Sequence, residues 1–220
     1  MSTDPRTPYL PLVATFGDPE MAEAWSEAAL IEAWCRVEGA LAAAQAELGD
    51  IPVVDAVEIR RRIGEARIDA ARLREGMRTV GYPILPLLGQ LRDAAHPGVA
   101  ASLHWGATTQ DIMDCAVALQ VAAGIDRLVA LTTGLGDPIA RLAGVHRATP
   151  MAGRTHDQIA VPTTFGAKLG VFLAELARHL DRLRAARTRA AVVSLYGAGG
   201  TASALGPGSA AVRSGVDRKS

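Results

Sequence analysis

Two long stretches of this chain carry apolar residues at helical spacing, and they limit the folds open to it more than any other feature. Residues 110 to about 146 repeat apolar positions every three or four residues, and so do residues 161 to about 195. Pro162 suits the first turn of the second stretch. At ~1.5 Å of rise per residue, each helix would be around 50 Å long. Helices of this length need partners to cover their apolar sides, so we predict a helical bundle.

The rest of the chain up to residue 106 is also predicted to be helical. One helix is expected over residues 19–48, and a more exposed helix, or a pair of short ones, over residues 54–77. Another helix starts at Pro83 and is broken at residues 96–98. Residues 134–138 are expected to interrupt or kink the first long helix. Alanine, leucine and arginine dominate, and aromatic residues make up only 4%, which favours packed helices over a sheet sandwich. The sequence therefore predicts an all-α fold.

Charge and cysteine use argue against several classes of function. The formal net charge is zero and basic residues are dispersed, so nucleic-acid binding is not expected. Cys35 and Cys115 fall on apolar helical faces, which indicates buried free thiols in a reducing compartment. Residues 1–9 lack the apolar core of a signal peptide, and we find no run of about 18 apolar residues to span a bilayer. We expect a cytoplasmic protein without nucleic acid or membrane partners.

The most informative polar cluster is HWGATTQD, residues 104–111, directly before the first long helix. Thr108 or Thr109 can cap that helix, with Asp111 in its first turn. The helix N-terminus carries unpaired N–H groups and the positive end of the dipole, so an anionic substrate group could dock there. The alternative is that threonine and aspartate simply form a capping box.

A second polar cluster, GRTHDQ, covers residues 153–158 between the two long helical patterns. A lone histidine is more often a surface or structural residue than a catalyst. Here His156 is flanked by a hydroxyl, a guanidinium and an amide, a mixture that can bind a dianion and move a proton near neutral pH. Five polar residues in a row rarely fill a core, so this cluster is a second candidate for a site.

Three stretches of the sequence resemble the fumarase/aspartase superfamily, in the branch of 3-carboxy-cis,cis-muconate cycloisomerase and adenylosuccinate lyase. They are residues 31–52, 104–120 (HWGATTQDIMDCAVALQ) and 151–183 (MAGRTHDQIAVPTTFGAKLGVFLAELARHLDRL). The resemblance implies an N-terminal helical domain over residues 1–106 and the first long helices of an incomplete central bundle over residues 107–196. It also implies a homotetramer whose active sites collect residues from three subunits.

The resemblance implies a reaction as well. Such enzymes remove a proton next to a carboxylate and expel a leaving group, which requires oriented donors where negative charge grows. Thr108 and Thr109 match the carboxylate-binding pair, and His156 matches a histidine that acts as general acid or positions one. Thr155 matches a substrate-contacting hydroxyl. Two weaker substrate-binding candidates are Gln158 and His104; for His104 the alternative is that it only orients the threonine loop. Neither a cofactor nor a metal site is expected, because no phosphate-cradling glycine motif or metal-ligand spacing occurs.

The sequence departs from the family in ways that leave its function open. The family's catalytic base is a serine on a loop of the form Gly-Ser-Ser-x-Met-Pro. These 220 residues lack that loop, so the chain, with its glycine-rich tail at residues 197–220, looks like a C-terminally truncated member of the family. The chain is either a shortened lyase or a catalytically silent helical protein, which keeps the motifs for packing or pairs with another subunit. The residues also point to two different subfamilies. Tyr82 matches the pattern of the cycloisomerases, whereas His156 matches that of adenylosuccinate lyase.

Overall fold

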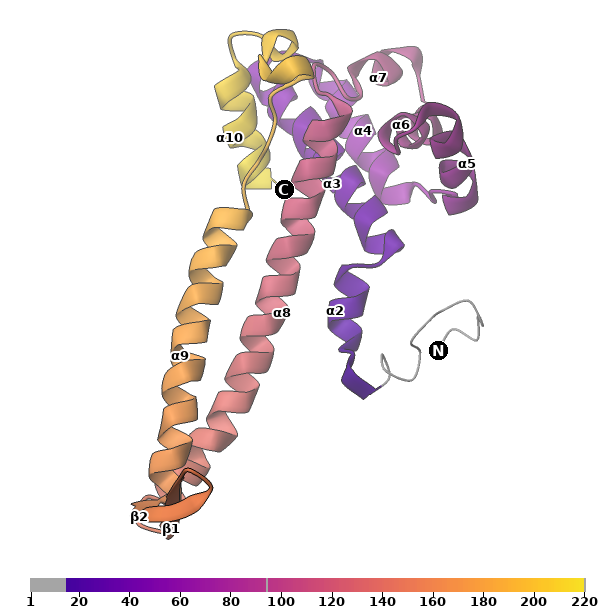
Figure 1. Cartoon of the computed structure of the whole chain (residues 1–220). Helices are drawn as coiled ribbons and strands as arrows, with labels where there is room; N and C mark the ends of the chain where they lie inside the picture. The colour runs from indigo at the N-terminus through magenta and orange to yellow at the C-terminus, as the bar shows by residue number, and fades with distance from the viewer. Residues whose placement is uncertain (1–14, 94, 220) are drawn as a thin grey trace. The chain divides into compact units, whose positions relative to one another are not determined.

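The computed structural model describes residues 15–93 and 95–219, and in that part of the chain the one sheet is a two-stranded hairpin among helices (Figure 1). The predicted all-α class is confirmed. Residues 1–9, where we expected no signal peptide, lie outside the described residues. Contacts divide the chain into unit 1, Met1–Val121 with Ala191–Ser220, and unit 2, Ala122–Ala190. The domain boundaries expected from the family resemblance stay a prediction.

Unit 1 contains most of the short helices. They are α2 Pro19–Ala24, α3 Glu27–Leu48, α4 Val53–Glu65, α5 Ala70–Val80, α6 Ile84–Arg92, α7 Pro97–Ser102 and α10 Ser209–Lys219. The single helix expected over residues 19–48 is wrong, because the backbone is extended at Ser26 and its hydroxyl caps α3 by accepting the N–H of Ala29 at 3.0 Å. The pair of short helices expected over residues 54–77 is present as α4 and α5.

The core of unit 1 is built around α3, which packs against α4 and α10. Its centre consists of aliphatic side chains that are almost completely removed from water: Val37, Leu41, Ile59, Leu73, Ile84, Leu87, Ile112, Leu195, Val212 and Val216. At ~25 cal/mol per Å² of buried apolar surface, side chains of this size each contribute about 1.5–3 kcal/mol. The C-terminal segment supplies three of them.

The glycine-rich tail forms no second core, as the sequence predicted, but it is part of the first. Leu205 on the loop and Val216 on α10 are buried in unit 1. Gly215 allows α10 to lie directly on α3, because a Cβ at this position would come within 2.7 Å of the Cβ of Ala44. Composition alone did not indicate this, since glycine-rich polar segments read as loops.

Unit 2 consists of the end of α8 (Thr109–Val145), the hairpin strands β1 (Pro150–Thr155) and β2 (Gln158–Thr164), and α9 (Phe165–Ala190). The second long helix therefore starts later than residue 161, and Pro162 lies in β2 opposite Ala152 instead of in a helical turn. The β-branched residues of β2 favour an extended backbone. The helix begins at Phe165, where the Thr164 hydroxyl accepts the N–H of Ala167.

The two helices of unit 2 are joined at several points. Arg187 on α9 forms a two-bond ion pair with Asp126 on α8, with N–O distances of 2.6 and 2.9 Å. Gly166 lies so close to the end of α8 that a Cβ would come within 2.7 Å of the Ala143 carbonyl oxygen. Contrary to our expectation, residues 134–138 do not interrupt α8, which continues with Pro138 inside it.

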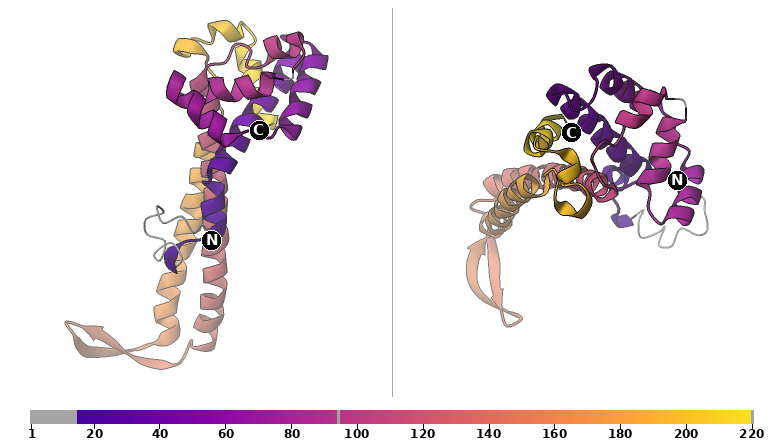
Figure 2. Two further views of the ribbon diagram at one scale, coloured as in Figure 1. Left: turned by 90° about the vertical axis from the view of Figure 1, so that its right-hand side faces the viewer. Right: turned by 90° about the horizontal axis from the view of Figure 1, so that it is seen from above.

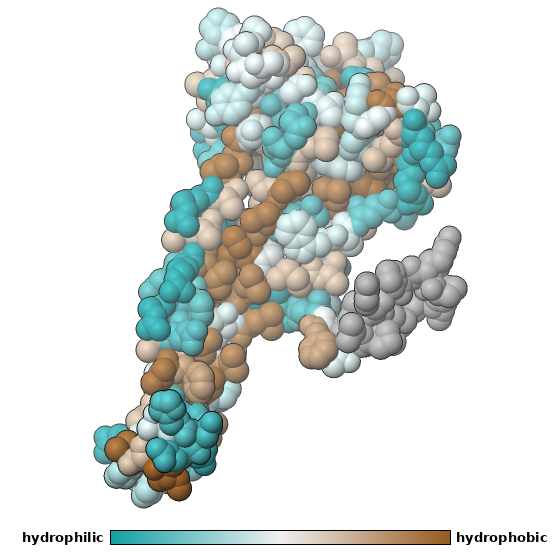
Figure 3. Space-filling view, viewed as in Figure 1, coloured by the Kyte–Doolittle hydropathy of each residue, from teal (hydrophilic) through white to brown (hydrophobic). Residues whose placement is uncertain are grey.

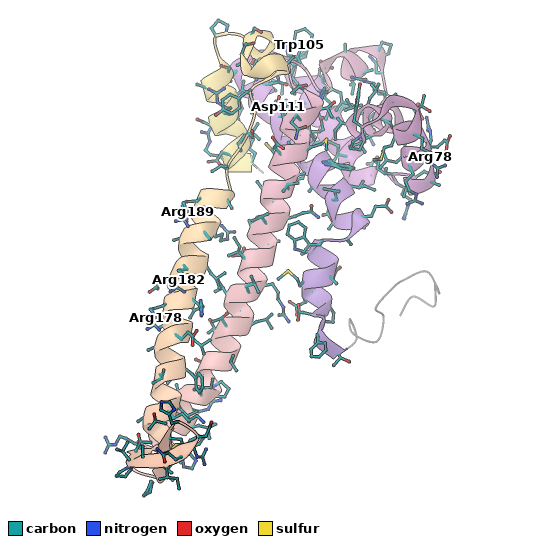
Figure 4. The ribbon with its side chains drawn as sticks, in the orientation of Figure 1. Arg78, Trp105, Asp111, Arg178, Arg182 and Arg189 are labelled. Carbon is teal, nitrogen blue, oxygen red and sulfur yellow. The ribbon has the colours of Figure 1, made fainter. Side chains whose placement is uncertain are left out.

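Unit 2 leaves much of its apolar surface exposed. Brown, apolar atoms run along its helices in Figure 3, and the exposed large side chains include Leu128, Leu135 and Leu142 on α8 and Phe172 on α9. Figure 4 shows Arg178 and Arg182 on the side of α9 that faces away from α8. By length and composition, α8 is also apolar enough to cross a membrane, which our sequence analysis did not anticipate. A helix of a soluble bundle meets the same criterion.

Candidate functional site

The first predicted motif forms a tight turn that leads into α8. His104 and Gly106 both have positive φ angles, of 65° and 70°. Glycine is required at 106, because a Cβ there would come within 2.7 Å of the Ala204 carbonyl oxygen. For His104 this backbone conformation is unfavourable and persists only if the surroundings hold it. The turn is therefore a strained and closely packed piece of backbone.

Helix α3 holds this turn from one side through two buried polar side chains. Glu38 Oε1 lies 2.6 Å from His104 Nδ1, and the Gln45 Nε2 amide donates to the Trp105 carbonyl oxygen at 2.7 Å. Each of the two α3 residues is only 1% exposed. Sequence reasoning missed both of them, although a glutamate and a glutamine seven residues apart on an otherwise apolar helix face are a usable signal.

Asp111 holds the turn from the other side. Its carboxylate accepts three backbone N–H groups, those of Thr108 at 3.0 Å, Tyr196 at 2.8 Å and Gly197 at 2.9 Å. The side chain is 4% exposed, and charge-assisted bonds of this kind are the strong ones. Figure 4 labels Asp111 and Trp105 at the N-terminal end of α8. Asp111 thus does more than the capping role expected of it, because it also fastens the 196–197 segment.

Thr108 and Thr109 stand at the start of α8, as predicted. Thr109 is the first helical residue, and the Thr108 carbonyl accepts the N–H of Asp111 at 3.0 Å. The expected hydroxyl cap is replaced by the opposite half of a capping box, in which the Asp111 carboxylate accepts from Thr108. Both threonines are half-buried, and in residues 15–93 and 95–219 neither hydroxyl has a hydrogen-bond partner. Their hydroxyls are therefore available to a ligand.

The second predicted motif lies at the turn of the hairpin in unit 2, which extends away from the ends of the two helices (Figure 2). Thr155 pairs with Gln158 across the strands, leaving His156 and Asp157 as a two-residue turn with φ angles of 49° and 58°. Such turns normally use asparagine and glycine. All four side chains are exposed. The hairpin thus brings Thr155, His156 and Gln158 together, while His104, Thr108 and Thr109 belong to unit 1.

Other features of the described residues lie apart from these motifs. Burial raises the pKa of the Cys35 thiol to about 12 and that of Cys115 to about 11, so both remain protonated thiols, as expected from the sequence. A groove of about 910 Å³ between α3 and the α4–α5 segment contains none of the predicted site residues. No group of three His, Cys, Asp or Glu side chains suited to a metal ion occurs in the described part of the chain.

Comparison with known proteins shows which protein family this chain belongs to. The family described as Lyase matches residues 15–212, so the chain belongs to that family. Within it, the resemblance to the fumarase/aspartase superfamily is confirmed. The chain is 35% identical over 196 residues to adenylosuccinate lyase of Methanocaldococcus jannaschii, covering 89% of the chain and 42% of that protein.

Two solved structures share the fold closely. Fumarate lyase from Mesorhizobium sp. BNC1 is 42% identical with a TM-score of 0.88, over 92% of this chain and 48% of that one. The beta-carboxy-cis,cis-muconate cycloisomerase from Acinetobacter calcoaceticus sp. ADP1 is 32% identical with a TM-score of 0.88, over 94% of this chain and 50% of that one. The chain spans half or less of the length of each of these relatives.

Proposed function

We propose that this chain is part of a lyase or cycloisomerase that acts on a small dicarboxylate or tricarboxylate, most like 3-carboxy-cis,cis-muconate cycloisomerase. The observation that carries the proposal is the pair of hydroxyls of Thr108 and Thr109 at the N-terminal end of α8. They have no hydrogen-bond partner among the described residues, and their backbone is fixed by the buried carboxylate of Asp111. Preorganised donors at a helix N-terminus suit a carboxylate.

In the proposed reaction, a proton leaves the carbon next to a substrate carboxylate, and negative charge collects on the carboxylate oxygens. Hydroxyls that are already oriented stabilise this charge without reorganising. His156 is proposed to protonate the leaving group or to position the group that does, with Thr155 and Gln158 contacting the substrate. In the family the base is a serine on a loop that these 220 residues lack. No cofactor or metal ion is needed for this chemistry.

The second candidate is a carbon–nitrogen lyase of the adenylosuccinate lyase type. The observation that favours it is His156 at the exposed tip of the hairpin, because this residue resembles the histidine of adenylosuccinate lyase. Similarity to the Methanocaldococcus enzyme supports it as well. The two candidates differ in substrate, so comparing the Kd for 3-carboxymuconate with that for adenylosuccinate separates them.

A third candidate, from another class, is a catalytically silent helical partner subunit. It is supported by the exposed apolar side chains of unit 2, which need cover in water. For all three candidates we propose a homo-oligomer, a tetramer for the lyases, in a cytoplasmic setting without nucleic acid or membrane. Light scattering should show an oligomer, and a monomer that melts cooperatively would contradict this part of the proposal.

The carboxylate site is tested by replacing Thr108 with valine, which keeps the shape of the side chain and removes its hydroxyl. We expect the Kd for fumarate to rise about tenfold, because a hydrogen bond to a charged group is worth roughly 1.5–3 kcal/mol. Thr133→Val, on the exposed surface of α8, is the matched control. An unchanged Kd in Thr108→Val would overturn the site. We expect no turnover by this chain alone, because it lacks the serine base. A robust rate with either substrate would contradict this expectation.

A further inference from the structure

The pairing of Glu38 with His104 joins two residues that are 66 positions apart in the sequence. The Glu38 side chain has no exposed surface, while that of His104 is 15% exposed. Oε1 of the carboxylate lies 2.6 Å from Nδ1 of the ring. Thus one edge of the imidazole is held inside unit 1, and a small part of the ring reaches the surface in the same turn that leads to Thr108.

Burying a glutamate at this position has a cost as well as a benefit. Its second oxygen, Oε2, is buried and has no hydrogen-bond partner in the described part of the chain. A buried carboxylate with an unpaired oxygen carries a large desolvation cost. Its neighbours on α3, Val37 and Leu41, are completely buried apolar residues.

The tautomer of the ring depends on the pairing with Glu38. An ionised carboxylate can only accept a hydrogen bond, and opposite such a partner Nδ1 of His104 would carry the hydrogen and Nε2 would be the remaining polar atom. Nε2 has no hydrogen-bond partner in residues 15–93 and 95–219. The next residue of the turn is held separately, because the Gln45 amide donates to the Trp105 carbonyl oxygen at 2.7 Å.

We propose that Glu38 is a positioning residue that sets the tautomer and orientation of His104, so that Nε2 contacts the substrate carboxylate bound by Thr108 and Thr109. When a protonated Nε2 donates to that carboxylate, the buried negative charge of Glu38 balances the imidazolium, as the carboxylate of a catalytic triad does. This inference rests on the proposed function, since it assumes that Thr108 and Thr109 bind a carboxylate. It assigns His104 a direct contact with the ligand.

The pair is tested first without any ligand, by nitrogen NMR of the His104 ring, assigned with a His104→Asn variant. In the natural protein we expect a slowly exchanging hydrogen on Nδ1. In Glu38→Met that hydrogen should exchange rapidly and the ring should shift toward the Nε2–H tautomer. Gln45→Met, which removes an equally buried polar side chain of α3, should leave the Nδ1 hydrogen in place. An unchanged tautomer in Glu38→Met would overturn the inference.

The second measurement is the Kd for fumarate. Glu38→Met should bind fumarate about tenfold more weakly, the lower end of what losing an outer positioning partner costs. If Thr108→Val binds fumarate normally, or if fumarate fails to bind at all, the proposed function fails, and the NMR result still decides the pairing. If Thr108→Val is weakened and Glu38→Met is not, this inference alone fails.

A third variant guards against a folding defect. Glu38→Gln keeps the size and shape of the side chain, and its amide can either accept from Nδ1–H or donate to a bare Nδ1. We therefore expect both tautomers of His104 in this variant, with fumarate affinity between those of the natural protein and Glu38→Met. A single Nδ1–H tautomer together with unchanged affinity in Glu38→Gln would contradict the need for a charged carboxylate.

Discussion

Asp111 and Gly197 are joined by a hydrogen bond of 2.9 Å from the Gly197 N–H to the carboxylate, although 86 positions separate them. The same carboxylate accepts the N–H groups of Tyr196 and Thr108. One buried side chain therefore ties the start of α8 to the segment that follows α9 in the sequence. This makes Asp111 a structural anchor of the candidate site.

Replacing Asp111 with alanine should lower the free energy of unfolding by about 3 kcal/mol, because three backbone N–H groups lose a charged acceptor. Urea unfolding followed by circular dichroism measures the change. Asp114→Ala is the matched control, since Asp114 lies on the exposed side of the same helix and its change should stay within about 0.5 kcal/mol. Equal losses in the two variants would contradict the anchoring role.

Replacing Gly106 with alanine should destabilise unit 1 by about 2–4 kcal/mol, because the new Cβ meets the Ala204 carbonyl oxygen at 2.7 Å and the φ angle is positive. Thermal melting reports the loss, and fumarate binding should weaken as the turn shifts. In Gly134→Ala a Cβ meets nothing within 4 Å on α8, so that control should gain roughly 0.5–1 kcal/mol. The prediction fails if the two substitutions have the same sign.

Replacing Asp157 with glycine should stabilise the hairpin by about 1 kcal/mol, because glycine adopts the φ of 58° found there without strain. Hydrogen exchange at the amides of β1 and β2 should slow correspondingly. Asp137→Gly, in the interior of α8 in the same unit, should instead destabilise, by roughly 0.5 kcal/mol. Faster exchange in Asp157→Gly would show that the aspartate itself supports the turn.

Stability should fall as the pH rises above 9, because the two buried thiols are harder to ionise in the folded protein than in the unfolded chain. Their pKa values are raised from 9.0 to about 12 for Cys35 and about 11 for Cys115. Their contribution is complete below pH 9 and is lost progressively toward the raised values, with a limiting slope of about 1.4 kcal/mol per pH unit for each thiol.

The measurement is urea unfolding under reducing conditions at pH 7, 9 and 10. The control is the double variant Cys35→Ala with Cys115→Ala, in which the other groups that titrate in this range are unchanged. We expect the difference in stability between the two proteins to shrink as the pH rises. Parallel curves would contradict the burial of the thiols. Alkylation of the natural protein should be slow until it unfolds, because the thiolate is the reactive form.

Periodicity and short motifs predicted much of this molecule. The helices, the family and the place of Thr108 and Thr109 at a helix start all follow from local patterns. The hairpin did not, because Val161 and Pro162 continue the apolar pattern of α9, and only the β-branched residues of β2 indicate a strand. The break at Ser26 was missed for a similar reason, since apolar spacing continues across it.

The contacts that define the candidate site could not be predicted. Glu38 lies on α3 and His104 in the turn before α8, and nothing in the local sequence of either specifies the other. Asp111 could be recognised as a capping residue from its spacing to Thr108, but not as the acceptor for Tyr196 and Gly197. Spacing describes neighbours along one element, whereas these partners are chosen by how α3, α8 and the C-terminal segment pack.

The dependence of unit 1 on α10 has a consequence during synthesis. Val212 and Val216 complete a hydrophobic core whose other members are mostly encoded before residue 122. In a nascent polypeptide emerging from the ribosome, the side of α3 that contacts α10 would therefore stay uncovered until the 11 residues of α10 had been made. Exposed apolar surface makes an incomplete polypeptide prone to aggregation. Chaperones would therefore matter most before α10 is made.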